Sequence, residues 1–172
     1  MADSLEKVVD DLRETPHIAP DFPPTELCVQ CDGACCRRLP GAFFPNDLGD
    51  ITVEGVVAFV LSGRACFDSW DGDPRTDKDE LVEAYFLRPR AVNARHEVVD
   101  RSWGGDVCVH LSDSGCMLSR DEMPTACKAL EPGKERCIDH SNGKNGAAIA
   151  WLPYRDILEM AIGICERANK DI

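Results

Sequence analysis

The sequence predicts a small single domain of the α+β class, built from helices plus a short hairpin. Its 172 residues match the usual size of one domain, roughly 100 to 200 residues. Apolar residues recur at helical spacing in several segments, and two short strand-like runs lie close together in the second half of the chain. We therefore expect one domain over residues 1–172, without an internal repeat apart from the recurrence of cysteine.

Three segments have the apolar periodicity of helices. Residues 4–14 carry apolar side chains at positions i, i+3, i+4 and i+7, which form one face of a helix. Residues 52–62 carry a stripe of valines, with Thr52 as the predicted N-cap. Residues 153–169 begin with a proline, a favoured first helical residue, and have a long apolar stripe. We predict a helix in each segment.

Other segments predict extended structure and turns. The runs VCVHL (107–111) and GCMLS (115–119) are joined by SDSG and predict the hairpin. YFLRPRAV (85–92) is typical of an extended segment, and the acidic stretch SWDGDPRTDKDE (69–80) of an exposed loop. Two Asn-Gly pairs within residues 142–146 predict turns.

Composition limits the compartment and the partners. The longest apolar runs, VVAFVL and AAIAWLP, are far shorter than the ~20 residues that span a membrane, and the first residues lack the apolar core of a signal peptide. We expect a cytoplasmic protein without a membrane partner. The net charge of −12 disfavours nucleic acid, whose binding depends on lysine and arginine contacts with phosphates. A cation, a basic protein or a basic peptide suits this charge.

Cysteine gives the strongest chemical signal. Ten cysteines in a reducing compartment favour metal binding or catalysis over disulfides. Eight of them form two blocks, residues 28–36 (CVQCDGACC) and residues 108–137, and we predict these eight as metal ligands: Cys28, Cys31, Cys35, Cys36, Cys108, Cys116, Cys127 and Cys137. Cys66 stands alone and Cys165 lies in the apolar stripe of the last helix, so both are expected in the core.

The first block is expected to lie in a loop, and its spacing is typical of a metal knuckle. Cys28 and Cys31 are two residues apart and can bind one ion, to which Cys35 can return after a turn at Gly33. Neighbouring side chains diverge, so Cys36 indicates either two adjacent metals or one ligand beside a redox or core thiol. Eight thiols suffice for two four-thiolate sites, or for one cluster that draws on both blocks.

Two histidines lie close to the second block in the sequence. His110 is inside it, and His140 follows Cys137 by three residues. A single histidine beside a metal site is more often a hydrogen-bonded neighbour than a ligand. We predict that role for both side chains.

With these residues the chain resembles a known family. CVQCDGACC matches CxxCxxxCC, the signature of the zinc- or iron-chelating domain family of YkgJ-type cysteine-cluster proteins. The second block is similar to the family's later signature at Cys108, His110-Leu111, Gly115-Cys116, Met123-Pro124 and Cys127, with methionine in place of the usual arginine; Cys137 resembles a further cysteine of some members. The resemblance implies a domain held together by a metal centre that cysteines of both blocks ligate, with zinc and iron both open.

The resemblance extends to one group of enzymes. A related cysteine motif occurs in flagellin lysine methylases, which look like enzymes that combine an iron-sulfur centre with S-adenosylmethionine. This link favours an iron-sulfur cluster slightly over Zn²⁺ as the expected cofactor.

Three functions follow from these observations. The first is a cytosolic metal-binding protein that holds an iron-sulfur cluster or zinc through both cysteine blocks. The second is a metal-dependent methyltransferase or redox enzyme acting on a protein or peptide, so whether the chain is an enzyme stays open. The third is a structural zinc module for protein–protein interaction, with predicted contacts at Trp70, Tyr85, Phe86 and the run RPR (88–90).

Overall fold

A two-stranded antiparallel hairpin, β1 (Ala65–Asp71) and β2 (Glu83–Pro89), forms the centre of the fold. The pairing runs from Ala65 opposite Pro89 to Asp71 opposite Glu83. Aromatic side chains in both strands favour this pairing, because they pack well on a pleated, half-buried surface. The extended segment predicted at residues 85–92 is confirmed over most of its length.

Three longer helices pack against this hairpin. α4 (Val53–Leu61) begins after Thr52, whose hydroxyl accepts a hydrogen bond from the Gly55 amide at 3.1 Å. α6 (Gly143–Trp151) continues through the 3₁₀ turn η2 (Leu152–Tyr154) into α7 (Arg155–Lys170). The helices predicted at 52–62 and 153–169 are confirmed, each within a few residues of the predicted ends.

The turns predicted from the Asn-Gly pairs are wrong, because the glycines of both pairs belong to helix α6. Asn142 does have a left-handed backbone, with φ of 58°, but it directly precedes the first residue of the helix. The second pair lies inside α6, where a Cβ on Gly146 would overlap the carbonyl oxygen of Ser141. Glycine is therefore needed here for a close approach to the backbone five residues earlier, and this local contact outweighs its low helix propensity.

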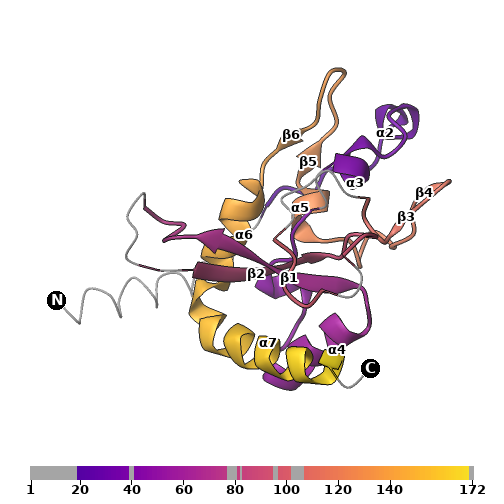
Figure 1. Ribbon diagram of the computed structural model, residues 1–172. Helices are drawn as coiled ribbons and strands as arrows, with labels where there is room; N and C mark the ends of the chain where they lie inside the picture. Colours follow the sequence, from indigo (N-terminus) through magenta and orange to yellow (C-terminus); the bar gives the residue numbers. More distant parts are fainter. Residues whose placement is uncertain are drawn as a thin grey trace.

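The computed structural model describes residues 19–38, 41–76, 81, 83–94, 97–101 and 107–170. The helix predicted at residues 4–14 lies outside this part of the chain. In Figure 1 the hairpin lies in the middle, with α4 and α7 on one side and the cysteine-bearing segments on the other. Within the described residues, no helix is long and apolar enough to cross a membrane.

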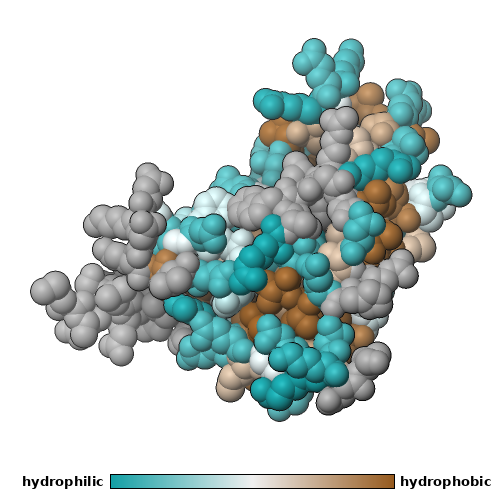
Figure 2. Space-filling model, in the orientation of Figure 1, coloured by the Kyte–Doolittle hydropathy of each residue, from teal (hydrophilic) through white to brown (hydrophobic). Residues whose placement is uncertain are grey.

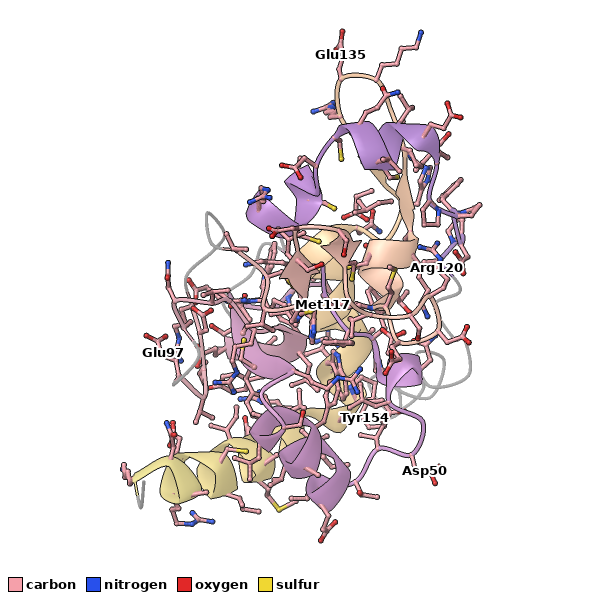
Figure 3. The ribbon with its side chains drawn as sticks, turned by 90° about the vertical axis from the view of Figure 1, so that its right-hand side faces the viewer. Asp50, Glu97, Met117, Arg120, Glu135 and Tyr154 are labelled. Atoms are coloured by element: carbon pink, nitrogen blue, oxygen red, sulfur yellow. The ribbon has the colours of Figure 1, made fainter. Side chains whose placement is uncertain are left out.

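The cysteine-bearing side consists of short elements. The first block, predicted as a loop, instead forms two short helices joined by a turn. The hairpin predicted at 107–119 is confirmed, although its paired part is shorter than expected. The bounds are α2 (Glu26–Gln30), α3 (Ala34–Arg38), η1 (Pro45–Asp47), β3 (Leu111–Ser112), β4 (Gly115–Cys116), α5 (Thr125–Lys128), β5 (Leu130–Glu131) and β6 (Ile138–Asp139). The arm between β5 and β6 projects from the body, with Glu135 at its tip (Figures 1 and 3).

The core includes the two cysteines outside the blocks. Cys66 in β1 and Cys165 in α7 are fully buried, as predicted. Trp151 is also fully buried, and its indole nitrogen donates a hydrogen bond to the carbonyl oxygen of Phe43 at 2.7 Å. These contacts join α6 and α7 to the strands through apolar packing.

A buried ionic network joins β1, β2 and α6. The Arg88 side chain donates to Asp68 at 2.7 Å and to Asp100, and all three side chains are almost completely inaccessible to solvent. The Lys144 ammonium lies 3.0 Å from the same Asp68 carboxylate. A buried charge is tolerated only when it is paired in this way.

Burial corrects two predictions about exposed residues. Phe86, Arg88 and Arg90 are buried, so they do not form the interaction surface that the sequence suggested. The loop predicted at 69–80 is also wrong at its start, since its first three residues belong to β1. Asp73, expected in solvent, is buried beside Arg75.

Candidate metal centre

The first cysteine block folds around a tight turn. Asp32 and Gly33 have positive φ angles of 52° and 68°, which place α3 back against the second block. A Cβ on Gly33 would lie 2.8 Å from Leu111 Cδ1, a flexible side-chain end that can move aside, so the left-handed φ is what requires glycine here. The sequence prediction that Gly33 permits this turn is confirmed.

A backbone hydrogen bond joins the two cysteine blocks directly. The amide of Cys108 donates to the carbonyl oxygen of Cys36 at 2.8 Å. On its other side, Cys108 forms an isolated antiparallel bridge with Ala91, just beyond β2. The β3–β4 pairing then places Cys116 opposite Leu111. Two segments about seventy residues apart in the sequence are therefore adjacent in the fold.

The fourth segment of the site is the short helix α5, which carries Cys127. Asp47 holds the start of α5, because its carboxylate accepts hydrogen bonds from the Thr125 amide at 2.8 Å and the Thr125 hydroxyl at 2.7 Å. Gly41 lies against the other end, where an added Cβ would overlap Cys127 Sγ. The absence of a side chain at this glycine is what leaves room for the thiol.

Five cysteine side chains line one small cavity of about 20 Å³. They are Cys35, Cys36, Cys108, Cys116 and Cys127, and the remaining wall consists of Gly41, Pro89, His110, Leu118 and Pro124. Cys108 is buried, Cys36 and Cys127 are half-buried, and the other two are exposed. The cavity is thus sulfur-lined and open to solvent. Figure 2 shows hydrophobic residues at the surface on the upper right of the view, the side on which α3 and the β3–β4 hairpin lie in Figure 1.

The thiols of this cavity perturb one another. A hydrogen bond with Cys36 and burial raise the pKa of Cys35, and a hydrogen bond with Cys108 raises the pKa of Cys36 to about 12. The same hydrogen bond lowers the pKa of Cys108, because it stabilises the Cys108 thiolate. Burial, followed by the charges of Cys36 and Cys35, raises the pKa of Cys127. Several thiols therefore share one apolar space in which more than one negative charge is unfavourable without a cation.

Both histidine side chains are hydrogen-bonded, whereas their predicted role beside a metal stays a prediction. His110 Nε2 lies 3.0 Å from the carbonyl oxygen of Arg64, and burial lowers the pKa of its imidazole, which favours the neutral form. His140 Nε2 lies 2.8 Å from a carboxylate oxygen of Glu131, outside the cavity. His110 is thus a wall residue that is fixed by the backbone rather than by a thiol.

Three of the eight predicted ligands do not line the cavity. Cys28 lies in α2 and Cys31 caps its end, and Cys137 directly precedes β6. In both ribbon views, α2 lies beside the β5–β6 arm (Figures 1 and 3). Within the described ranges, no three His, Cys, Asp or Glu side chains stand where they could bind one metal ion together. The five cavity-lining cysteines therefore lie near one another without forming a metal-coordination site.

A second, larger cavity on the side of η1 and α4 escaped the sequence analysis. Its volume is about 480 Å³, and its wall includes four carboxylates from two distant segments, residues 47–50 and 121–122. The sequence does contain these acidic residues, but nothing in their spacing shows that the two segments meet.

Comparisons with protein-family models, with curated proteins and with solved structures gave no match to this chain.

Proposed function

We propose that this chain is a cytoplasmic metal-binding protein whose two cysteine blocks bind a metal ion or cluster between them. One observation carries the proposal: five thiols from four separate segments line a single cavity. The hydrogen bond from Cys108 to Cys36 supports it, because this bond joins the two blocks at the cavity wall. A scatter of unrelated core cysteines would not gather in this way.

The donor set favours a soft or borderline metal. All five candidate ligands are sulfur atoms, and such sites select zinc, copper(I) or iron-sulfur clusters rather than magnesium or calcium. A bound cation would also offset the repulsion between neighbouring thiolates, since a thiol that coordinates a metal is deprotonated outright. Metal binding then requires rotation of the side chains toward a common centre and release of their protons, so affinity rises with pH.

The cavity volume bears on the choice between an ion and a cluster. About 20 Å³ is close to the space of one water molecule, roughly 10 to 15 Å³ of probe volume. A single zinc ion needs less space than an iron-sulfur cluster, and rotation of the thiol side chains would have to bring four of the five thiolates to it. An iron-sulfur cluster, which the family resemblance favours, needs α3 and the β3–β4 hairpin to separate further. We therefore propose a single thiolate-bound Zn²⁺ as the occupant. An iron-sulfur cluster is the alternative that metal analysis would detect.

The test is metal analysis of anaerobically purified protein, with iron, zinc and acid-labile sulfide quantified on the same sample as an absorption spectrum. Colourless protein with stoichiometric zinc is expected. A broad absorption near ~400 nm together with sulfide would identify an iron-sulfur cluster instead. Folded protein that takes up neither metal would refute the proposal.

Two cysteine variants localise the metal. Cys108→Ala removes a thiol of the cavity, and we expect loss of bound metal. Cys165→Ala removes a buried thiol of α7 outside the cavity, and we expect unchanged metal content. Equal metal content in both variants would place the metal elsewhere in the chain.

The alternative functions have weaker support. The interaction module loses four of its six predicted contacts, because Phe86 and all three residues of the run 88–90 are buried. The methyltransferase or redox enzyme rests on the family resemblance alone. Binding of S-adenosylmethionine, or a redox change at the bound metal, is the observation that would favour it.

A further inference from the structure

The larger cavity combines an aromatic floor with a negatively charged rim. Phe43 and Phe59 contact each other edge to face in its wall, with ring centroids 4.9 Å apart. Its volume of about 480 Å³ falls in the range of small-molecule sites, roughly 300 to 1,000 Å³. An aromatic face beside carboxylates is the arrangement that attracts an organic cation.

The rim carries an excess of negative charge. Four carboxylates, those of Asp47, Asp50, Asp121 and Glu122, line the cavity together with one guanidinium, that of Arg64. The Asp47 carboxylate is already used, since it accepts hydrogen bonds from the Phe44 and Thr125 amides. No side-chain hydrogen bond or ion pair joins Asp50 or Asp121 to another residue in the described part of the chain. Figure 3 shows Asp50 at the outer edge of the loop that precedes α4.

The chain's own arginine shows which cation these groups accept. The Arg64 guanidinium lies 5.7 Å from the centroid of the Phe59 ring, in the range of a cation–π contact. It also pairs with Glu122 at 3.3 Å, a long and exposed ion pair that contributes little stability. Arg64 therefore occupies one edge of the cavity loosely, while the carboxylates of Asp50 and Asp121 are available to a second cation.

From these contacts we infer that the cavity binds an arginine side chain of a basic peptide or protein segment. The guanidinium would pair with Asp50 or Asp121 at the rim, while its aliphatic stem and flat face pack on the aromatic floor. Arginine fits better than lysine, because a planar guanidinium both stacks on a ring and forms paired hydrogen bonds with carboxylates. The overall charge of −12 attracts such a partner from a distance. The inference does not depend on the proposed metal.

The experiment is a calorimetric titration of the full chain with acetyl-Gly-Arg-Gly-amide. The matched probe is the same peptide with citrulline, which keeps the shape of arginine but has no charge. We expect the arginine peptide to bind about tenfold more tightly, because a hydrogen bond to a charged group is stronger than one between neutral groups. Equal binding of the two peptides would overturn the inference.

Three variants separate this cavity from general charge attraction. Asp121→Asn removes a rim carboxylate and weakens binding of the arginine peptide. Asp113→Asn removes the same charge from the exposed β3–β4 turn and leaves binding unchanged. Arg64→Ala removes a competing guanidinium and tightens binding. If Asp113→Asn weakens binding as much as Asp121→Asn does, or if Arg64→Ala weakens it, the assigned cavity is wrong.

Discussion

Substitution of Gly41 by alanine tests the construction of the cysteine cavity without removing a thiol. A Cβ at this position would overlap Cys127 Sγ and would lie 3.0 Å from the Cys127 backbone nitrogen. The thiol can rotate away, but the backbone of α5 is held in place by the hydrogen bonds from Thr125 to Asp47. We therefore expect Cys127 to turn out of the cavity, while the close contact with the held backbone of α5 destabilises the fold.

The size of the effect follows from the overlap. Insertion of a methyl group into a packed site costs typically about 1 to 3 kcal/mol. For a chain of 172 residues, this loss lowers the melting temperature by roughly 2 to 12 °C, at about 2 to 4 °C per kcal/mol. If Cys127 is a ligand, displacement of its thiol also weakens metal binding by about tenfold for each 1.4 kcal/mol lost.

The assay compares thermal unfolding and zinc affinity of Gly41→Ala with those of Gly163→Ala. Gly163 lies in α7, where an added Cβ would meet only the Arg167 guanidinium at 3.6 Å. Alanine should stabilise that helix by up to about 1 kcal/mol. A Gly41→Ala protein with wild-type melting temperature and wild-type zinc affinity would refute the packing of Cys127 against this glycine.

Three other substitutions test the fold. Asp68→Ala leaves the buried Arg88 without one of its two carboxylates and should cost about 3 to 5 kcal/mol in urea unfolding; a loss below 1 kcal/mol would contradict the buried pairing. Thr52→Ala removes the N-cap of α4 and should cost about 1 kcal/mol, whereas Thr52→Ser should be nearly neutral. The pKa of Asp73 is lowered by hydrogen bonds from Arg75, so its ionised form stabilises the fold above the usual carboxyl pKa of about 3.9. This stability is lost as the pH falls through the lowered pKa, and the melting temperatures of wild type and Asp73→Asn should converge in acid; a constant difference would exclude the ion pair.

The helices were the part of the fold that sequence reasoning predicted best. The stripes at 52–62 and 153–169 were confirmed because apolar periodicity reports which helix face is buried, and this property is local. The prediction of a turn at the Asn-Gly pair inside α6 was wrong although its cause is also local. Its glycine is required by a close contact with the Ser141 carbonyl at the start of the helix, which the turn preference of the pair does not report.

The burial of charged residues also could not be predicted from the sequence. The run RPR in β2 is typical of an exposed surface, yet Arg88 is buried because Asp68 and Asp100 approach it from other segments. An isolated buried guanidinium would be too costly, so its position depends on partners that only the fold supplies. The first cysteine block likewise became two short helices rather than a loop.

The sequence by itself determined the chemistry of this protein: its thiols, their grouping into two blocks and its acidic charge. Only the tertiary structure decided that five of the eight thiols line one cavity and that Cys28, Cys31 and Cys137 lie outside it. It alone brought residues 47–50 and 121–122 together around an aromatic floor. The physical reason is that spacing along the chain constrains only nearby residues. Contacts between distant segments depend on packing free energy that offsets the entropy of closing the loops between them.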